Sequence, residues 1–126
     1  RAARRAAAEN PKSTMVAFAG SIEAITAKHV AQAAREYDDV ALAVMHEAGS
    51  WLGIALSNIA NLFDPQTIVL GGGVARAGEI FLGVARDRLV SMTGAQRRRP
   101  MRLDVTALGR DAGILGAAAL AFDEAR

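Results

Sequence analysis

The stretch TIVLGGG at residues 67–73 decides how the rest of this chain is interpreted. Residues 67–70 form a short, continuous run of β-branched and apolar side chains, and three glycines follow directly. A run of this length that ends in glycine is typical of a strand buried on both faces of a parallel sheet. We therefore predict a buried strand at 67–70, followed by a turn.

Downstream of this strand, the pattern alternates between helix and strand. Helical spacing resumes near Ala77 and continues to about Val90, and residues 102–107 alternate polar and apolar residues as a half-buried strand does. Asp111 can cap a final helix. The buried face of that helix is expected to contain Ile114, Leu115, Ala118 and Phe122. Strand, helix, strand and helix predict a βαβα unit of the α/β class, with parallel strands and a right-handed crossover.

Two strands make a poor parallel sheet, because such a sheet needs cover on both faces and normally contains more strands. We therefore expect that part of the domain is missing from residues 1–126, which form a single partial domain, or that this segment pairs with another chain.

Upstream of the strand, the sequence predicts helices. An Ala/Arg-rich helix at 1–9 should end at Asn10-Pro11, and a brief helix is possible within 12–25. Thr26 can cap a helix at about 27–36, and Asp38 and Asp39 can cap a long helix that stops at Asp64-Pro65.

The long helix has a broad apolar face, which predicts that it is largely buried. That face contains Leu42, Met45, Gly49, Leu52, Leu56, Ile59 and Phe63. Gly49 and Gly53 lie four residues apart and could let another backbone approach closely. Trp51 is expected in the core rather than stacked on a ligand.

The composition excludes several classes of protein. The 126 residues are 52% hydrophobic and 22% charged with a net charge of +2, as in a soluble globular protein. The basic cluster Arg97–Arg99 is expected to be a solvated loop and not a DNA-binding domain. Without cysteines the chain has no disulfide, Cys-ligated zinc or Cys nucleophile, and His29 and His46 are too isolated to bind metal. No uninterrupted apolar run is long enough to cross a membrane, so we expect a cytoplasmic location.

The glycines at 71–73 follow the carboxyl end of the predicted strand and precede a helix. Ligands of open α/β sheets bind at such positions, and glycine lets a ligand lie directly against backbone N–H groups. The pattern is neither G-x-G-x-x-G nor G-x-x-x-x-G-K-[ST], so it indicates no dinucleotide fold and no P-loop. Two interpretations stay open at this point, which are ligand binding and a tight turn needed only for packing.

The sequence resembles the ROK family (repressor, open reading frame, kinase). FDPQTIVLGGGVARAGE at 63–79 and ALGRDAGILGAA at 107–118 are similar to the C-terminal motifs of that family. ITAKHVAQAAR at 25–35 and WLG at 51–53 resemble the preceding stretch in glucokinases of the actinobacterial type.

This resemblance implies the C-terminal portion of an actin-like ATPase (ribonuclease H-like) domain, with a long helix before the βαβα unit. It implies an ATP-dependent hexose kinase, with ATP and Mg²⁺ as cofactors, glucose the expected sugar and a homodimer the expected assembly. By the same resemblance, Gly71, Gly72 and Gly73 would line the adenosine and α-phosphate side of the cleft as nucleotide-binding residues, and Val74 would flank it.

The resemblance also implies that the catalytic and sugar-binding residues of the family lie outside this chain. The family's aspartate base, its phosphate loop and its sugar-binding residues belong to an N-terminal domain, and its cysteine-rich zinc motif is not present here. We expect no catalytic residue among residues 1–126 and no activity from them alone. The alternatives are the effector-binding, dimerising part of a ROK transcriptional repressor, which would bind nucleic acid elsewhere, and a structural half-domain that is stable only as a dimer.

Overall fold

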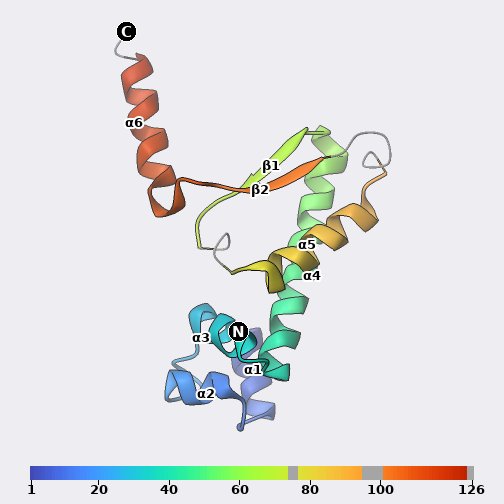
Figure 1. The fold of residues 1–126 in the computed structure, drawn as a ribbon, viewed down its shortest axis with the longest axis vertical. Coiled ribbons are helices and arrows are strands. Elements are labelled where there is room, and N and C mark those ends of the chain that lie inside the picture. The colour runs from blue at the N-terminus through green and yellow to red at the C-terminus, as the bar shows by residue number, and fades with distance from the viewer. Residues whose placement is uncertain (74–76, 95–100, 125–126) are drawn as a thin grey trace.

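The computed structural model describes residues 1–73, 77–94 and 101–124 (Figure 1). Its elements follow the predicted order. They are α1 (Ala2–Glu9), α2 (Thr14–Ala19), α3 (Ala27–Arg35), α4 (Asp39–Phe63), β1 (Thr67–Leu70), α5 (Glu79–Met92), β2 (Arg102–Val105), the 3-10 helix η3 (Gly109–Asp111) and α6 (Ala112–Glu124). The helices α1, α2 and α3 gather around the first half of α4, and the sheet lies beside its second half.

Asp38 joins the start of α2 to the start of α4. Its Oδ1 accepts a hydrogen bond from the N–H of Ala41 at 2.8 Å, which makes it the N-cap of α4 as predicted. Its Oδ2 accepts from the N–H of Thr14 at 2.7 Å and from the hydroxyls of Ser13 and Thr14 at 3.0 Å each. Partial burial raises the pKa of this carboxyl group, but the hydrogen bonds from Ala41, Thr14 and Ser13 outweigh it, so the pKa is lowered.

The helices α4 and α5 cross at two glycines. A Cβ at Gly49 would lie 2.7 Å from the carbonyl oxygen of Phe81, and one at Gly53 would lie 2.6 Å from that of Ala85. These distances are too short for any side chain, so the predicted close approach of another backbone is confirmed. The crossing buries Phe81, Leu82, Ala85 and Leu89 of α5.

The two strands are parallel, as predicted, in a register that pairs Thr67 with Arg102 and Leu70 with Val105. One face of the sheet packs Ile68, Leu70 and Leu103 against a cluster of Leu56, Ala60 and Leu89. The prediction of a strand buried on both faces is wrong, because Val69 on the other face is 60% exposed. Within the described residues, α4 and α5 cover one face only.

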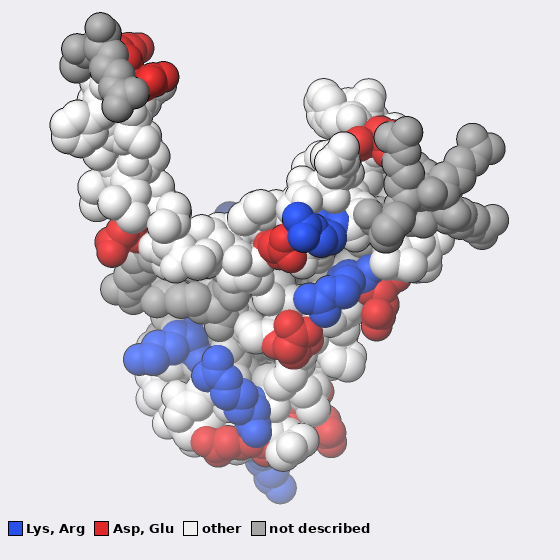
Figure 2. Space-filling model, turned by 45° about the horizontal axis from the view of Figure 1, so that its top comes forward, with Lys and Arg blue, Asp and Glu red and all other residues white. Residues whose placement is uncertain are grey.

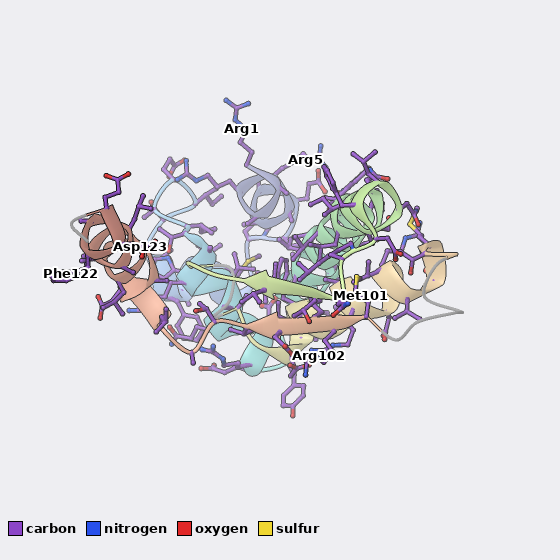
Figure 3. All side chains as sticks on the ribbon, turned by 90° about the horizontal axis from the view of Figure 1, so that it is seen from above. Arg1, Arg5, Met101, Arg102, Phe122 and Asp123 are labelled. Carbon is purple, nitrogen blue, oxygen red and sulfur yellow. The ribbon has the colours of Figure 1, made fainter. Side chains whose placement is uncertain are left out.

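The helix α6 stands apart from the rest of the molecule (Figure 1), and Figure 2 shows it as a projecting arm whose sides are uncharged. The predicted buried face is wrong, since Ile114 is 73% exposed and Phe122 is 76% exposed. In Figure 3 the side chain of Phe122 is directed away from the body. No residue of α6 is buried, because beyond the adjoining η3 no described element packs extensively against it.

Asp111 directly precedes α6, which is the N-cap position predicted for it. It also ends η3, so the 3-10 turn runs directly into α6.

The long helix α4 is less buried than predicted. Its buried residues, such as Met45 and Leu56, face the other helices and the sheet, whereas Trp51 is 65% exposed rather than in the core. By length and composition alone, α4 is also long and apolar enough to cross a membrane, although its apolar residues do not form one uninterrupted run. Its packing against α3 and α5 is that of a core helix.

Candidate functional site

The glycine turn at Gly71–Gly73 leaves the carboxyl end of β1, at the same sheet edge where β2 ends. All three glycines are exposed, and Gly72 has a φ of +73°, which side-chain-bearing residues rarely adopt. The N-terminus of α5 follows after Gly78, whose φ is +85°. The predicted order of strand, glycine turn and helix is therefore confirmed.

Packing does not explain the glycines. Among the described residues, a Cβ at Gly72 or Gly73 would meet no atom within 4 Å, and one at Gly71 would make only an ordinary contact of 3.6 Å with Cγ2 of Thr106. Gly72 and Gly73 thus have room for a side chain as far as the described residues show. This observation weighs against a turn needed only for packing, although the positive φ of Gly72 remains a conformational reason for glycine there.

Two of the sequence predictions fall on residues that lie outside the described part of the chain. They concern Val74, which follows the turn, and the basic cluster Arg97–Arg99.

A hollow of about 1000 Å³ opens beside the glycine turn. Gly73, Ala77 and Phe81 form its border on the side of the turn, and the remainder comes from α1, α3, α4 and the segment before α3. Apolar side chains of the helices contribute much of the lining, among them Val30, Val44 and Met45. Its volume is at the upper end of the range for pockets that hold small molecules and cofactors.

The described charged residues that line this hollow all have the same sign. Four of its described lining residues are basic, namely Arg1, Arg4, Lys28 and Arg35, and none is acidic. Four cations around one concave surface favour an anionic ligand. Sequence patterns do not indicate this feature, since Arg1 and Arg4 lie at the start of the chain, far in sequence from Lys28 and Arg35 of α3.

The N-terminus of α3 lies at the hollow and is held there by neighbouring groups. Nε and Nη2 of Arg4 both donate to the carbonyl oxygen of Ile25 at 3.4 Å, which ties α1 to the residue before Thr26. The N–H of Thr26 donates to Nδ1 of His29 at 3.3 Å, so His29 acts as an ordinary helix residue near its cap. Thr26, Ala27 and Lys28 border the hollow, and the positive end of a helix dipole adds to the basic side chains.

Elsewhere the charges are mixed. On the face that Figure 2 shows, basic and acidic side chains alternate, and one exposed pair joins Arg86 to Glu79 at 3.1 Å. Within the described part of the chain, no three His, Cys, Asp or Glu side chains are grouped closely enough to hold a metal ion. The described residues thus offer a surface for binding an anion but no metal centre.

Comparison with known proteins agrees with the sequence motifs. A sequence model of the ROK family matches residues 2–124, so this chain belongs to the ROK family. It is 36% identical to a glucokinase of Thermotoga maritima over 103 residues, which are 82% of this chain and 32% of that protein. It is 25% identical to a xylose repressor of Caldicellulosiruptor bescii over 104 residues, which are 82% of this chain and 26% of the repressor.

The fold is likewise shared with solved structures. The crystal structure of a ROK family glucokinase from Streptomyces griseus, in complex with glucose and AMPPNP, superposes with a TM-score of 0.85 and 34% identity. The match covers 95% of this chain and 40% of that one. The chain therefore spans about a third of the length of the glucokinases it matches.

Proposed function

We propose that residues 1–126 are the C-terminal, nucleotide-binding segment of an ATP-dependent sugar kinase, which transfers the γ-phosphoryl group of ATP to a hexose. The observation that carries this proposal is the exposed glycine turn, whose last glycine, Gly73, borders a hollow with four basic residues and no described acidic one. Relatives at about 35% identity are glucokinases, and the similar solved structure contains glucose and an ATP analogue. We assign the chain to part of an actin-like ATPase domain on the same grounds.

In this proposal the nucleoside of ATP lies in the hollow, against Gly71, Gly72, Gly73 and Val74. The apolar lining, including Val44 and Phe81, provides a surface for the base, as such side chains do in most cofactor pockets. Exposed backbone N–H groups of the turn would face the α-phosphate, where a Cβ would take the space of the ligand. The basic rim adds long-range attraction for the triphosphate.

Other parts of the reaction are not assigned to this chain. Mg²⁺ bound to ATP neutralises the charge that develops during phosphoryl transfer. We assign it no ligand among the described residues, because they form no cluster that suits a metal. No described carboxylate lies among the residues that line the hollow, so we assign no general base either. We expect the base and the sugar-binding residues in other parts of the protein, and we propose that the sugar is glucose.

The second candidate is a sugar-responsive ROK repressor, in which this segment would belong to the effector-binding and dimerising part. The similarity to a xylose repressor supports this alternative, although its identity is lower than that of the glucokinases. The two functions separate in one measurement on the full-length protein. A kinase forms ADP from ATP when glucose is added, whereas a repressor forms none and binds operator DNA.

We further propose that the full-length protein is a cytoplasmic homodimer. Exposed apolar side chains on α4, including Trp51, Leu62 and Phe63, support an interface with another surface. Light scattering of the full-length protein tests the assembly. A monomer across the micromolar range would contradict it.

The test of the proposed function is titration of the full-length protein with AMPPNP and with glucose, followed by a coupled assay for ADP. We expect binding of both ligands and glucose-dependent ADP formation. Binding of glucose without AMPPNP, together with no ADP, would refute the kinase and favour the repressor.

A further inference from the structure

Thr106 connects the end of the second strand to the residue that precedes the glycine turn. It directly follows β2, and its backbone N–H donates to the carbonyl oxygen of Leu70 at 2.8 Å. Leu70 is the last residue before Gly71, so this bond continues the ladder of the sheet up to the start of the turn.

The side chain of Thr106 makes two different contacts. Its methyl carbon, Cγ2, lies 3.6 Å from the position that a Cβ on Gly71 would occupy, and among the described residues other than Leu70, Gly71 and Gly72 no other atom lies within 4 Å of that position. Its hydroxyl oxygen accepts a hydrogen bond from the backbone N–H of Leu108 at 3.2 Å. One half-buried side chain therefore lies beside the start of the glycine turn and bonds to the connector to α6.

The connector leads to the projecting arm. Gly109, with a φ of +57°, redirects the chain into η3 and α6, and no residue of α6 is buried against the body. Thr106 therefore lies where the glycine turn and the connector to α6 meet.

We propose that Thr106 is a positioning residue for nucleotide binding, which holds the glycine turn and the α6 connector in one fixed arrangement. This inference rests on the proposed function, since it assumes that Gly71–Gly73 contact the nucleotide. Thr106 does not need to touch the ligand. It acts by restricting the backbone at Leu70–Gly71 and at Leu108.

Two variants of the full-length protein separate the roles of the side chain. Thr106→Val keeps the branched shape and the methyl group near Gly71 but cannot accept the bond from Leu108. Thr106→Ser keeps the hydroxyl group and removes the methyl group. Thr67→Val is the matched control, because it makes the same change on the paired strand, at a half-buried residue outside the turn.

We expect Thr106→Val to weaken AMPPNP binding by about fivefold, as the loss of one hydrogen bond does, with the dissociation constant for glucose changed less than about twofold. Thr106→Ser should restore most of the affinity, and Thr67→Val should bind like the wild type. Without any ligand, hydrogen exchange at Gly71–Gly73 should be faster in Thr106→Val than in Thr67→Val.

Failure of the proposed function and failure of the positioning role give different results in these measurements. If the wild type binds no AMPPNP, the proposed nucleotide site itself fails. If the wild type binds AMPPNP and Thr106→Val binds equally well with unchanged exchange in the turn, the positioning role is wrong. Equal losses of AMPPNP and glucose affinity, or no recovery in Thr106→Ser, would also overturn it, since both would indicate a general effect on stability.

Discussion

A Cβ on Gly53 would lie 2.6 Å from the carbonyl oxygen of Ala85, so α4 and α5 contact each other backbone to backbone at this point. Gly53→Ala should therefore lower the free energy of unfolding by about 2 kcal/mol, because the helices must separate to admit the methyl group. Denaturant unfolding followed by circular dichroism measures this effect.

The matched control for that substitution is Gly116→Ala, which also lies in a helix but has no described atom within 4 Å of the added Cβ. It should leave stability unchanged or raise it by up to about 1 kcal/mol, since alanine favours helix over glycine. Equal effects of the two substitutions would show that the α4–α5 contact is not as tight as described.

Gly72→Val in the full-length protein should weaken AMPPNP binding by at least about tenfold while glucose binding changes little, because the added side chain enters the space assigned to the nucleoside. Isothermal titration with each ligand measures the two affinities. Gly20→Val is the control for backbone strain, as Gly20 has a similar φ of +79° and equally open surroundings but lies at the end of α2, outside the glycine turn. Unchanged AMPPNP affinity in Gly72→Val would remove the turn from the site.

Lys28→Glu reverses a charge on the rim of the hollow. It should weaken AMPPNP binding by about fivefold to tenfold at low ionic strength, and the difference from the wild type should shrink at 0.5 M salt because exposed charges are screened. Lys12→Glu makes the same change on an exposed residue away from the hollow, and it should have little effect. A loss of affinity that is equal in both variants would assign the effect to net charge rather than to the rim.

Asp38 should make the free energy of unfolding depend on pH in the acidic range. Its pKa is lowered in the folded state, so its contribution is complete above the usual aspartate pKa of about 4 and is lost as the pH falls through the folded value. Asp38→Ala should cost about 1–2 kcal/mol at pH 7, the range for removal of an N-cap. Unfolding measured from pH 7 to pH 2 should show a smaller loss of stability in Asp38→Ala than in the wild type. A pH dependence that is identical in the two proteins would contradict this role.

Residues 1–126 alone should phosphorylate nothing. Phosphoryl transfer needs a bound sugar, a bound triphosphate with its metal, and a base within hydrogen-bond reach of the sugar hydroxyl, and the described residues supply at most the nucleoside side. A coupled assay with glucose, ATP and Mg²⁺ should remain at background. Turnover that persists after repurification and disappears in Gly72→Val would mean that catalytic residues have been overlooked in this chain.

The positions of helices and strands could be predicted because their signals are local. Asn10-Pro11 ends α1, Asp38 caps α4, and β1 ends where the glycines begin. Only small shifts occur, such as the start of α5 at Glu79 rather than Ala77, where the positive φ of Gly78 delays the helix.

Burial and the full site could not be predicted in the same way. Trp51, Val69 and Phe122 have the residue types of a core, but burial depends on neighbours that no other described element provides. The glycine turn was found because it is a continuous stretch. The basic rim was not, since tertiary packing brings Arg4 of α1 and Lys28 of α3 to the same hollow.

The isolation of α6 has a consequence for its own helical state. A helix of 13 residues that contains Gly113 and Gly116 is only marginally stable in water without tertiary contacts, because helix nucleation is unfavourable and glycine favours the coil. Because the described residues beyond the adjoining η3 provide no extensive packing for it, α6 would exchange rapidly between helix and coil on the timescale of helix–coil relaxation, whereas the buried turns of α4 would not. The apolar arm therefore gains a lasting shape only from the surface that it contacts, and its folding is thermodynamically part of that contact.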